Sequence, residues 1–381
     1  MAKRSKQPPQ LWERKIVIAT SPEVEGMLLS MAKNGQCRLI KQLKLVDGYL
    51  CEFPTRAEGP MVLEDHPWVA DVLDDPKITL IPPSSKLYSS AKSRVTQNWG
   101  IKKIQADEAW KITKGAGVKV AFLDTGVSLN HPDLRGGIKG GINILNPKSP
   151  PTDDNGHGTH VAGIIGARLN GFGVTGVAPE SHLYAVKAFD SNGEANLSDI
   201  VEGMQWCLDQ EIKLVNLSFG IRKDHRLLHS MVKKAASAGL LMVCAAGNEA
   251  KEGLEDSVLY PARYPETIAV SALTPDDDIA DFSSRGPEVD YIAPGTDILS
   301  TAPKGRYDTK SGTSFAAPHV AGLLALLLGY GNTSYAKCAV EHSALRNVLT
   351  NTAQKLPLLT RDQQGHGLVN AVKAVSYLCR R

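Results

Sequence analysis

Short apolar runs alternate with helical patterns through the larger, C-terminal part of this chain. Each run is mostly apolar and has the length of a buried strand. Because parallel strands must be joined by crossovers that are usually helical, this alternation predicts a doubly wound, mostly parallel α/β sheet. The expected strands cover 118–123, 183–188, 214–218, 241–246 and 267–272, and the expected helices cover 158–168, 197–210, 225–238 and 314–329.

The N-terminal part has a different order of elements. Residues 15–19 predict a strand and 22–33 a helix with Pro22 at its first position. Two further strands flank Asp47-Gly48, a hairpin turn signal; a helix over 65–72 and a strand over 77–81 complete a small βαββαβ unit. The expected division is therefore a loose N-terminus (1–12), a small α+β domain (13–81), an exposed Pro- and Ser-rich linker (82–97) and a large domain (98–381).

Composition excludes several kinds of function. Lys and Arg number 43 against 40 Asp and Glu, so charge does not indicate nucleic acid or an anionic membrane as a partner. The densest apolar stretch, 320–328, is far shorter than a membrane span. The basic N-terminus lacks an apolar segment behind it, so no signal peptide is recognised, and we expect a cytoplasmic monomer. The alternative is a secreted protein whose leader is absent from this sequence.

Three segments contain candidate catalytic residues. Asp124 directly follows an expected buried strand, where open α/β sheets bind ligands, although a turn or helix cap is the alternative for such an Asp. His157 lies between Gly156 and Gly158 at the start of an apolar helix, and its imidazole can exchange a proton near neutral pH. A metal site formed with His160 is the rival interpretation, but no His-Glu-x-x-His signature is present.

The third segment places Ser314 at the start of the longest apolar helix. A Ser at this position is either an N-cap or a nucleophile whose oxyanion is met by backbone N–H groups at the helix N-terminus. Asp, His and Ser in this chain order are the order of the subtilisin triad, and no Gly-x-Ser-x-Gly elbow surrounds Ser314. The three segments together therefore indicate nucleophilic catalysis more strongly than any one of them does.

These motifs resemble the signatures of the subtilisin-like serine protease family. The resemblance rests on Asp-Thr-Gly (124–126), His-Gly-Thr-His-Val-Ala-Gly (157–163) and Gly-Thr-Ser-x-Ala-x-Pro-His-Val-Ala-Gly (312–322), and it extends from about Trp99 to the C-terminus. It implies peptide-bond hydrolysis through an acyl-enzyme: Ser314 attacks, His157 moves the proton and Asp124 orients His157. Asn248, in a segment similar to the family's oxyanion segment, would donate to the oxyanion.

The resemblance also implies where peptide substrates bind. The substrate would add as a strand between two edges of the cleft, with a first side-chain pocket beyond them. A Leu at 259, where many relatives have Gly, should shorten this pocket. Glu194 and Glu249 either attract basic side chains or are simply solvated surface residues. The implied residues are Ser218, Phe219 and Gly220 on one edge, Gly193, Glu194 and Ala195 on the other, and Ala245, Gly247, Glu249 and Leu259 around the pocket.

Calcium is implied in the same way. Asp133 and Asn170 match family ligands, and backbone carbonyls of Arg168, Phe172 and Val174 would complete an oxygen-rich shell. The sequence departs from the family at one further ligand position, where Val95 replaces a Gln and Gln97 is displaced.

The small N-terminal domain resembles the inhibitory prodomain of the family. It would cover the cleft and be released by self-cleavage in the 82–97 linker, with Tyr88 as one candidate site. A permanently attached domain is the alternative. For the whole chain, the alternatives are a catalytically inactive binding protein on the same fold and a transpeptidase or esterase using the same triad.

Overall fold

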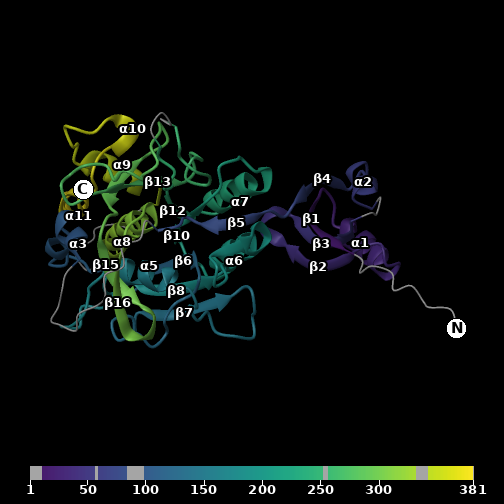
Figure 1. The fold of residues 1–381 in the computed structure, drawn as a ribbon, viewed down its shortest axis with the longest axis horizontal. Coiled ribbons are helices and arrows are strands. Elements are labelled where there is room, and N and C mark those ends of the chain that lie inside the picture. The colour runs from purple at the N-terminus through teal and green to yellow at the C-terminus, as the bar shows by residue number, and fades with distance from the viewer. Residues whose placement is uncertain (1–10, 56–58, 84–97, 252–255, 332–341, 381) are drawn as a thin grey trace. The chain divides into compact units, whose positions relative to one another are not determined.

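The computed structural model describes residues 11–55, 59–83, 98–251, 256–331 and 342–380. The chain forms two compact units, which are described separately (Figure 1). The smaller unit contains the residues up to Lys77 together with Asn196–Glu202, and the larger contains Ile78–Ala195 and Gly203–Arg381.

A seven-stranded parallel sheet forms the centre of the larger unit. Its strand order is β14-β13-β12-β10-β6-β8-β7, and every neighbouring pair is parallel. The five strands expected from the sequence are all present, and no strand end differs from its expected position by more than one residue. The sheet strands are β6 (Lys119–Asp124), β7 (Ile138–Asn143), β8 (His182–Lys187), β10 (Leu214–Leu217), β12 (Leu241–Ala245), β13 (Ile268–Leu273) and β14 (Tyr291–Pro294).

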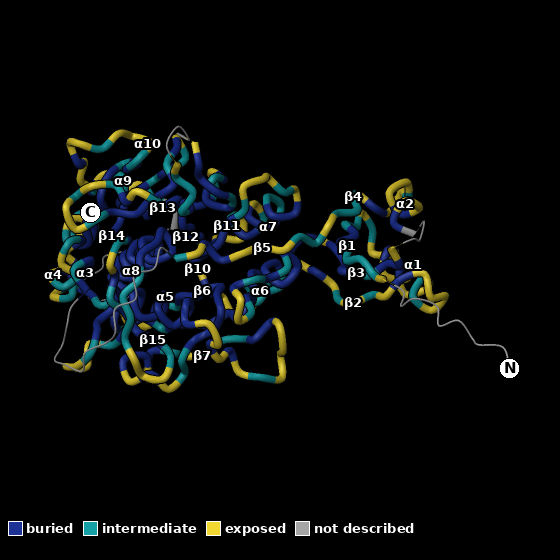
Figure 2. The backbone as a smooth tube through the Cα atoms, in the orientation of Figure 1, coloured by how far each residue is buried: buried dark blue, intermediate teal, exposed yellow. Residues whose placement is uncertain are grey.

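Helices cover both faces of this sheet, which gives the predicted doubly wound α/β fold (Figure 1). On one face α5 (His157–Gly166) packs beside α8 (Thr313–Gly331), and α6 (Leu197–Asp209) and α7 (Arg226–Ser237) lie on the other. Helix α8 is apolar on all sides because it runs through the core (Figure 2). In length and hydropathy it would pass for a membrane span, but 89% of its most apolar window is buried inside the protein, as in a core helix.

Shorter elements complete the larger unit. Two strands, β15 (Ile298–Ala302) and β16 (Arg306–Lys310), form an antiparallel hairpin that ends just before α8. A separate three-stranded sheet has the order β11-β5-β9, with β5 spanning Lys77–Leu80, β9 Glu194–Asn196 and β11 Phe219–Gly220. The remaining helices are α3 (Trp99–Lys103), α4 (Ala106–Ala109), α9 (His342–Thr352), α10 (Arg361–Gln364), α11 (Ala371–Cys379) and the 3₁₀ turn Pro303–Gly305.

The smaller unit is a four-stranded antiparallel sheet with two helices. Its strand order is β2-β3-β1-β4, and Val17, Leu28 and Phe53 are fully buried in its core. The chain order is βαββαβ, as the sequence predicts. The elements are β1 (Trp12–Ala19), α1 (Glu23–Lys33), β2 (Arg38–Leu43), the 3₁₀ turn Lys44–Val46, β3 (Gly48–Pro54), α2 (Gly59–Glu64) and β4 (Val69–Asp74).

The second half of this unit differs from the prediction in its boundaries. The helix expected over 65–72 is wrong: the helix ends at Glu64, and residues 69–74 are strand β4. Pro67 disfavours helical backbone at the residue before it, and Val69 and Val72 favour an extended chain. The strand expected over 77–81 exists as β5, but it pairs with β11 of the larger unit.

Five described cysteines are free thiols, and Cys207 and Cys244 are buried as expected. Cys338 lies outside the described residues.

Candidate active site

Asp124 and His157 form a buried pair at the carboxyl end of the parallel sheet. Asp124 is the last residue of β6, and His157 is the first residue of α5. The His157 Nδ1–H donates to both carboxylate oxygens of Asp124, at 2.8 and 2.9 Å. The two side chains are 0% and 3% exposed, so the carboxylate fixes the imidazole orientation in surroundings that exclude water.

The loop before α5 is organised by a second buried carboxylate. Asp153 accepts hydrogen bonds from the Gly156 N–H at 2.8 Å and from the N–H and hydroxyl of Thr159 at 2.9 and 2.5 Å. Burial acts to raise the pKa of Asp153, but these hydrogen bonds act against it and leave the pKa below its usual value. Gly158 allows α5 to approach β6, since a Cβ there would lie 2.2 Å from the Gly126 carbonyl oxygen.

Ser314 lies in the first turn of α8. Its hydroxyl donates to two carbonyl oxygens, that of Ile81 at 3.4 Å and that of Ser218 at 3.3 Å. His157 Nε2 is buried and has no hydrogen-bond partner among the residues that the structure describes. The hydroxyl proton is therefore directed away from the imidazole in this arrangement.

Asn248 is held with its amide toward the cleft. Its Oδ1 accepts hydrogen bonds from the Thr313 N–H and hydroxyl, both at 3.0 Å. This fixes Nδ2 as a donor facing outward, and it donates to the Pro82 carbonyl oxygen at 2.8 Å. A fixed side-chain donor beside Ser314 is the arrangement needed to stabilise an oxyanion.

Residues 78–82 occupy the cleft as an added strand. Thr79 and Leu80 pair with Gly220 and Phe219 of β11 in antiparallel register. On the opposite side, the Leu80 N–H donates to the Gly193 carbonyl at 2.9 Å, and β9 forms the second edge. The segments 218–220 and 193–195, inferred from the sequence as the two cleft edges, thus lie on either side of one extended chain.

This strand divides the two candidate donors, Ser314 and Asn248, between consecutive carbonyls. The Ser314 hydroxyl meets the Ile81 carbonyl, whereas the Asn248 amide meets the Pro82 carbonyl. Attack on a peptide bond requires the nucleophile and the oxyanion donor to face the same carbonyl. In addition, Pro82 supplies the nitrogen of the bond that follows Ile81, and this nitrogen carries no N–H.

Leu259 packs against glycines of the expected first pocket. A Cβ on Gly220 would lie 2.7 Å from Leu259 Cβ, and a Cβ on Gly247 would lie 2.8 Å from Leu259 Cγ. Leu259 and Ile81 are buried in the same apolar cluster, close to the end of β12 at Ala245. Glu249 forms an ion pair with Arg222, so its charge is already compensated.

The Asp133 loop is the candidate cation site. Asp133 is fully buried, and its carboxylate accepts hydrogen bonds from Asn170 Nδ2 at 3.0 Å and the Val174 N–H at 2.9 Å. The Tyr307 hydroxyl also bonds to it, and burial with this bond raises the pKa of Tyr307. The Arg168 N–H donates to the Asp133 carbonyl at 2.7 Å, which wraps the loop through Phe172 around the carboxylate.

This donor set fits a hard cation. Among the described residues every partner of the Asp133 carboxylate is neutral, so the hydrogen bonds are satisfied but the negative charge is not balanced. Asn170 turns its Nδ2 toward the carboxylate, while its Oδ1 accepts from the Phe172 N–H; a cation would use the carboxylate together with amide and carbonyl oxygens of this loop, which are ligands that Ca²⁺ prefers. Val95 and Gln97, which bear on the remaining ligand position, lie outside the described residues.

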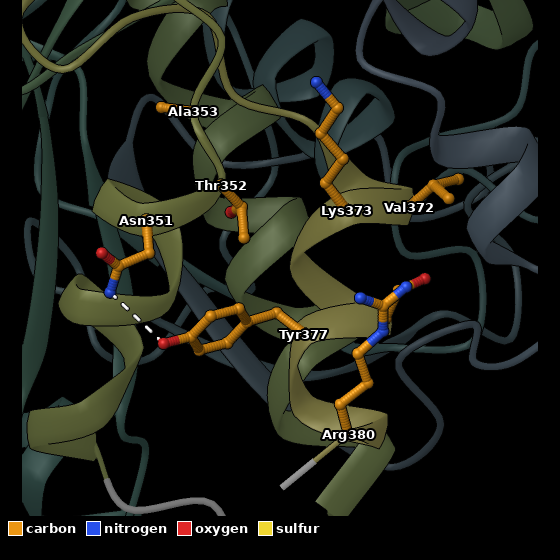
Figure 3. A pocket seen from close by; sticks show the side chains of 8 residues that line it. Asn351, Thr352, Ala353, Val372, Lys373, Tyr377 and Arg380 are labelled. Carbon is orange, nitrogen blue, oxygen red and sulfur yellow. Dashed lines mark hydrogen bonds between the residues drawn. The ribbon is translucent and has the colours of Figure 1, made fainter.

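A second hollow lies far along the chain from these residues. Helices α9 and α11 border a space of about 390 Å³, lined by Asn351, Lys373, Tyr377 and Arg380 among others (Figure 3). Asn351 Nδ2 donates to the Tyr377 hydroxyl across it at 3.5 Å. None of the residues with candidate chemistry lines this hollow.

Sequence reasoning missed several residues that support the site. Thr313 orients Asn248, Asp153 organises the histidine loop and Tyr307 holds Asp133. Thr313 lies within a recognised motif and Asp153 close before another, so their position was a usable signal. Tyr307 and Lys310 come from the β15–β16 hairpin, and no local pattern connects that hairpin to either site.

A parallel α/β sheet that carries a buried Asp–His pair and an adjacent Ser at a helix N-terminus is the scaffold of a serine hydrolase. The chain belongs to the subtilase family, whose model matches residues 115–367. It is 42% identical over 276 residues to an intracellular serine protease of Paenibacillus polymyxa, covering 71% of this chain and 84% of that protein. It is 38% identical over 312 residues to subtilisin E of Bacillus subtilis (strain 168), covering 81% and 78%.

A third relative is longer than this chain. The minor extracellular protease Epr of Bacillus subtilis (strain 168) is 42% identical over 275 residues, which is 72% of this chain but only 41% of Epr. The names of these relatives include intracellular and extracellular enzymes, so the family occurs in both compartments. Family and relatives together identify the chain as a serine endopeptidase, and peptides as its substrates.

Proposed function

We propose that this chain hydrolyses peptide bonds through the triad Asp124, His157 and Ser314, with Asn248 as the oxyanion donor. One observation carries the proposal: an extended segment in the cleft presents its carbonyls to Ser314 and Asn248 beside the buried Asp124–His157 pair. Ser314 attacks the carbonyl carbon while His157 Nε2 takes the hydroxyl proton. The same nitrogen then gives that proton to the leaving amine, and water repeats the cycle on the acyl-enzyme.

The test is a paired expression of wild type and Ser314→Ala, with casein digestion and active-site labelling by a fluorophosphonate. Wild type should digest casein and gain one covalent label, whereas Ser314→Ala should do neither. Ser311→Ala is the matched control, because it removes a hydroxyl three residues away. A wild type that is neither labelled nor active would refute the triad assignment.

We further propose that residues 13–81 are a built-in inhibitor and that the chain is a self-processed zymogen. Within the smaller unit, Asp75 accepts bonds from the N–H and hydroxyl of Ser198, each at 2.8 Å, and from Arg14 Nε at 2.8 Å. Lys41 pairs with Asp199 at 3.0 Å and with Glu202. These contacts fasten the small sheet to the first turns of α6, and β5 continues directly into the cleft.

The bond between Ile81 and Pro82 should resist cleavage, because the two catalytic donors face different carbonyls there. Pro82→Ala restores an N–H and lets the tail shift, so the variant should release a fragment ending at Ile81, detectable by intact mass. Pro83→Ala should not release this fragment. Processing within 82–97, with Tyr88 as a candidate, remains a prediction, and residues 84–97 lie outside the described ones. An intact Pro82→Ala chain in an active preparation would count against the register argument.

Calcium at the Asp133 loop is part of the same proposal. When bound, the ion supplies positive charge to a buried carboxylate and fixes the loop that follows α5. Asp133 and Asn170 would hold it through their side chains, and Arg168, Phe172 and Val174 through their carbonyls.

We also propose that the first pocket accepts small and branched aliphatic side chains. Leu259 packs against Gly220 and Gly247, and Ile81 is 2% exposed beside it. Leu259→Gly should raise kcat/KM for Phe relative to Val at the cleaved position by roughly tenfold, from the usual value of a few methylenes of pocket space. An unchanged Phe to Val ratio in this variant would remove Leu259 from the pocket.

A further inference from the structure

Lys310 is a partly buried cation that the proposed reaction does not use. It is the last residue of β16 and lies close in the chain to Ser314. Its Nζ donates to the Gly156 carbonyl oxygen at 3.3 Å, and Gly156 directly precedes His157. Burial lowers the pKa of Lys310, while Asp308, Asp153 and Asp124 act to raise it.

None of these three carboxylates serves as a direct partner of the ammonium. Asp124 is bonded through both oxygens to His157, and Asp153 accepts bonds from neutral groups of its own loop. Asp308 accepts the adjacent Thr309 N–H at 2.8 Å. Among the described residues, Lys310 forms no ion pair, and its ammonium donates to a neutral carbonyl. A partly buried ammonium with unused N–H donors can form a strong charge-assisted hydrogen bond with a carboxylate.

The position of Lys310 places its ammonium on the leaving-group side of the cleft. His157 must give its proton to the leaving amine, so the chain after the scissile bond starts beside the imidazole of His157, which directly follows the loop ending at Gly156. Lys310 is bonded to this loop and keeps part of its side chain exposed. The acyl side, in contrast, is built from backbone edges and the expected first pocket beside Leu259.

We propose that Lys310 selects substrates with an acidic side chain in the first two positions after the scissile bond. The inference rests on the proposed function, because it assigns the leaving-group side from the role of His157. The ligand is a carboxylate of Asp or Glu, held by the Lys310 ammonium in a charge-assisted hydrogen bond. The effect lies in kcat/KM for such peptides and requires no change in the chemical steps.

The test compares two internally quenched peptides that differ only in Glu or Gln at these positions. With wild-type full-length protein incubated with calcium, kcat/KM should be roughly five- to tenfold higher for Glu, as expected for one partly buried charged contact, and the ratio should shrink in 1 M salt. Lys310→Met should bring the ratio to one, and Lys310→Glu should make the Gln peptide the better substrate. Lys304→Met, which removes an exposed charge from the same hairpin, should keep the wild-type ratio.

A peptide nitroanilide, which has no residue on the leaving side, separates the two proposals. If wild type hydrolyses the nitroanilide but cleaves the Glu and Gln peptides equally, the role of Lys310 is refuted while the triad stands. A preference for Glu that persists in Lys310→Met refutes it equally. A wild type that hydrolyses none of the three substrates overturns both proposals.

Discussion

Two buried aspartates, one at the end of β6 and one in the loop that leads into β7, have opposite surroundings. Asp124, at the end of β6, bonds to His157, a group that can carry positive charge. Asp133, in the next loop, bonds to an amide, a backbone N–H and a hydroxyl, and none of these can. Both aspartates are 0% exposed, so burial alone does not distinguish their roles.

The partner decides what each carboxylate can do. An ionised carboxylate is costly to bury unless an opposite charge compensates it. At Asp124 the compensation appears when His157 gains a proton, which is the state that peptide hydrolysis passes through. At Asp133 none of the described hydrogen-bond partners provides it, which is why we propose a cation there. This difference supports the two proposed roles, catalysis at Asp124 and cation binding at Asp133.

The largest expected effect comes from breaking the first pair. Asp124→Asn keeps the shape but removes the charge and leaves His157 without its acceptor. We expect kcat on a peptide nitroanilide to fall by about 10⁴-fold, a figure taken from trypsin and subtilisin, where the same group was replaced. Asp281→Asn, which changes an exposed carboxylate, should not change kcat. A loss of tenfold or less in Asp124→Asn would mean that His157 does not depend on this carboxylate.

A third buried group sharpens the comparison, because it is a histidine without a carboxylate. His319 in α8 donates from Nδ1 to the Phe315 carbonyl at 2.8 Å, and its Nε2 lies 3.3 Å from the Asn98 amide nitrogen. Burial lowers the pKa of His319 to about 4. The Phe315 carbonyl acts to raise this pKa, but His319, unlike His157, has no carboxylate partner among the described residues.

The pH dependence that follows has a definite sign. The unfolded chain binds a proton at this position near pH 6.5, and the folded chain binds it only near pH 4. Stability is therefore fully present above pH 6.5 and falls as the pH is lowered toward 4, by up to about 3 kcal/mol at roughly 1.4 kcal/mol per pKa unit. Urea unfolding of a Ser314→Ala background, with and without His319→Gln, measures this term without self-digestion. Equal pH slopes for the two proteins would contradict it.

The sequence predicted the framework of this molecule because its signals are local. The five sheet strands were recognisable as apolar runs, and Asp124, His157 and Ser314 stand beside glycines at the junctions of strands and helices. The helix expected over 65–72 was wrong because acidic and apolar residues there fit either element until pairing with β1 fixed a strand. Contacts between residues far apart in the sequence could not be predicted: Lys310 bonds to Gly156, and Tyr307 bonds to Asp133.

The strand that fills the cleft could not be predicted from the sequence either. The two edges were inferred from resemblance, but their occupant was not, because residues 78–82 have the pattern of an ordinary strand. Pro82 was assigned to the linker on composition alone. The role of Pro82 depends on how the strand is aligned in the cleft: the Asn248 amide faces the carbonyl of Pro82, whereas Ser314 faces that of Ile81. Which carbonyl of a bound strand faces which donor is set by contacts between distant segments, and no single segment of the sequence encodes them.

The smallest expected effect tests the second aspartate. Calcium at 100 times its dissociation constant should stabilise the Ser314→Ala protein by about 2.7 kcal/mol. For a unit of this size, that raises Tm by roughly 5–10 °C. Asp133→Asn should lose this calcium-dependent rise, because it removes the only charge of the site. Tyr307→Phe removes one neutral donor and keeps the charge, so it should retain the rise. If calcium raises Tm equally in Asp133→Asn, then the ion binds elsewhere, and the buried charge of Asp133 is carried by its neutral hydrogen bonds alone.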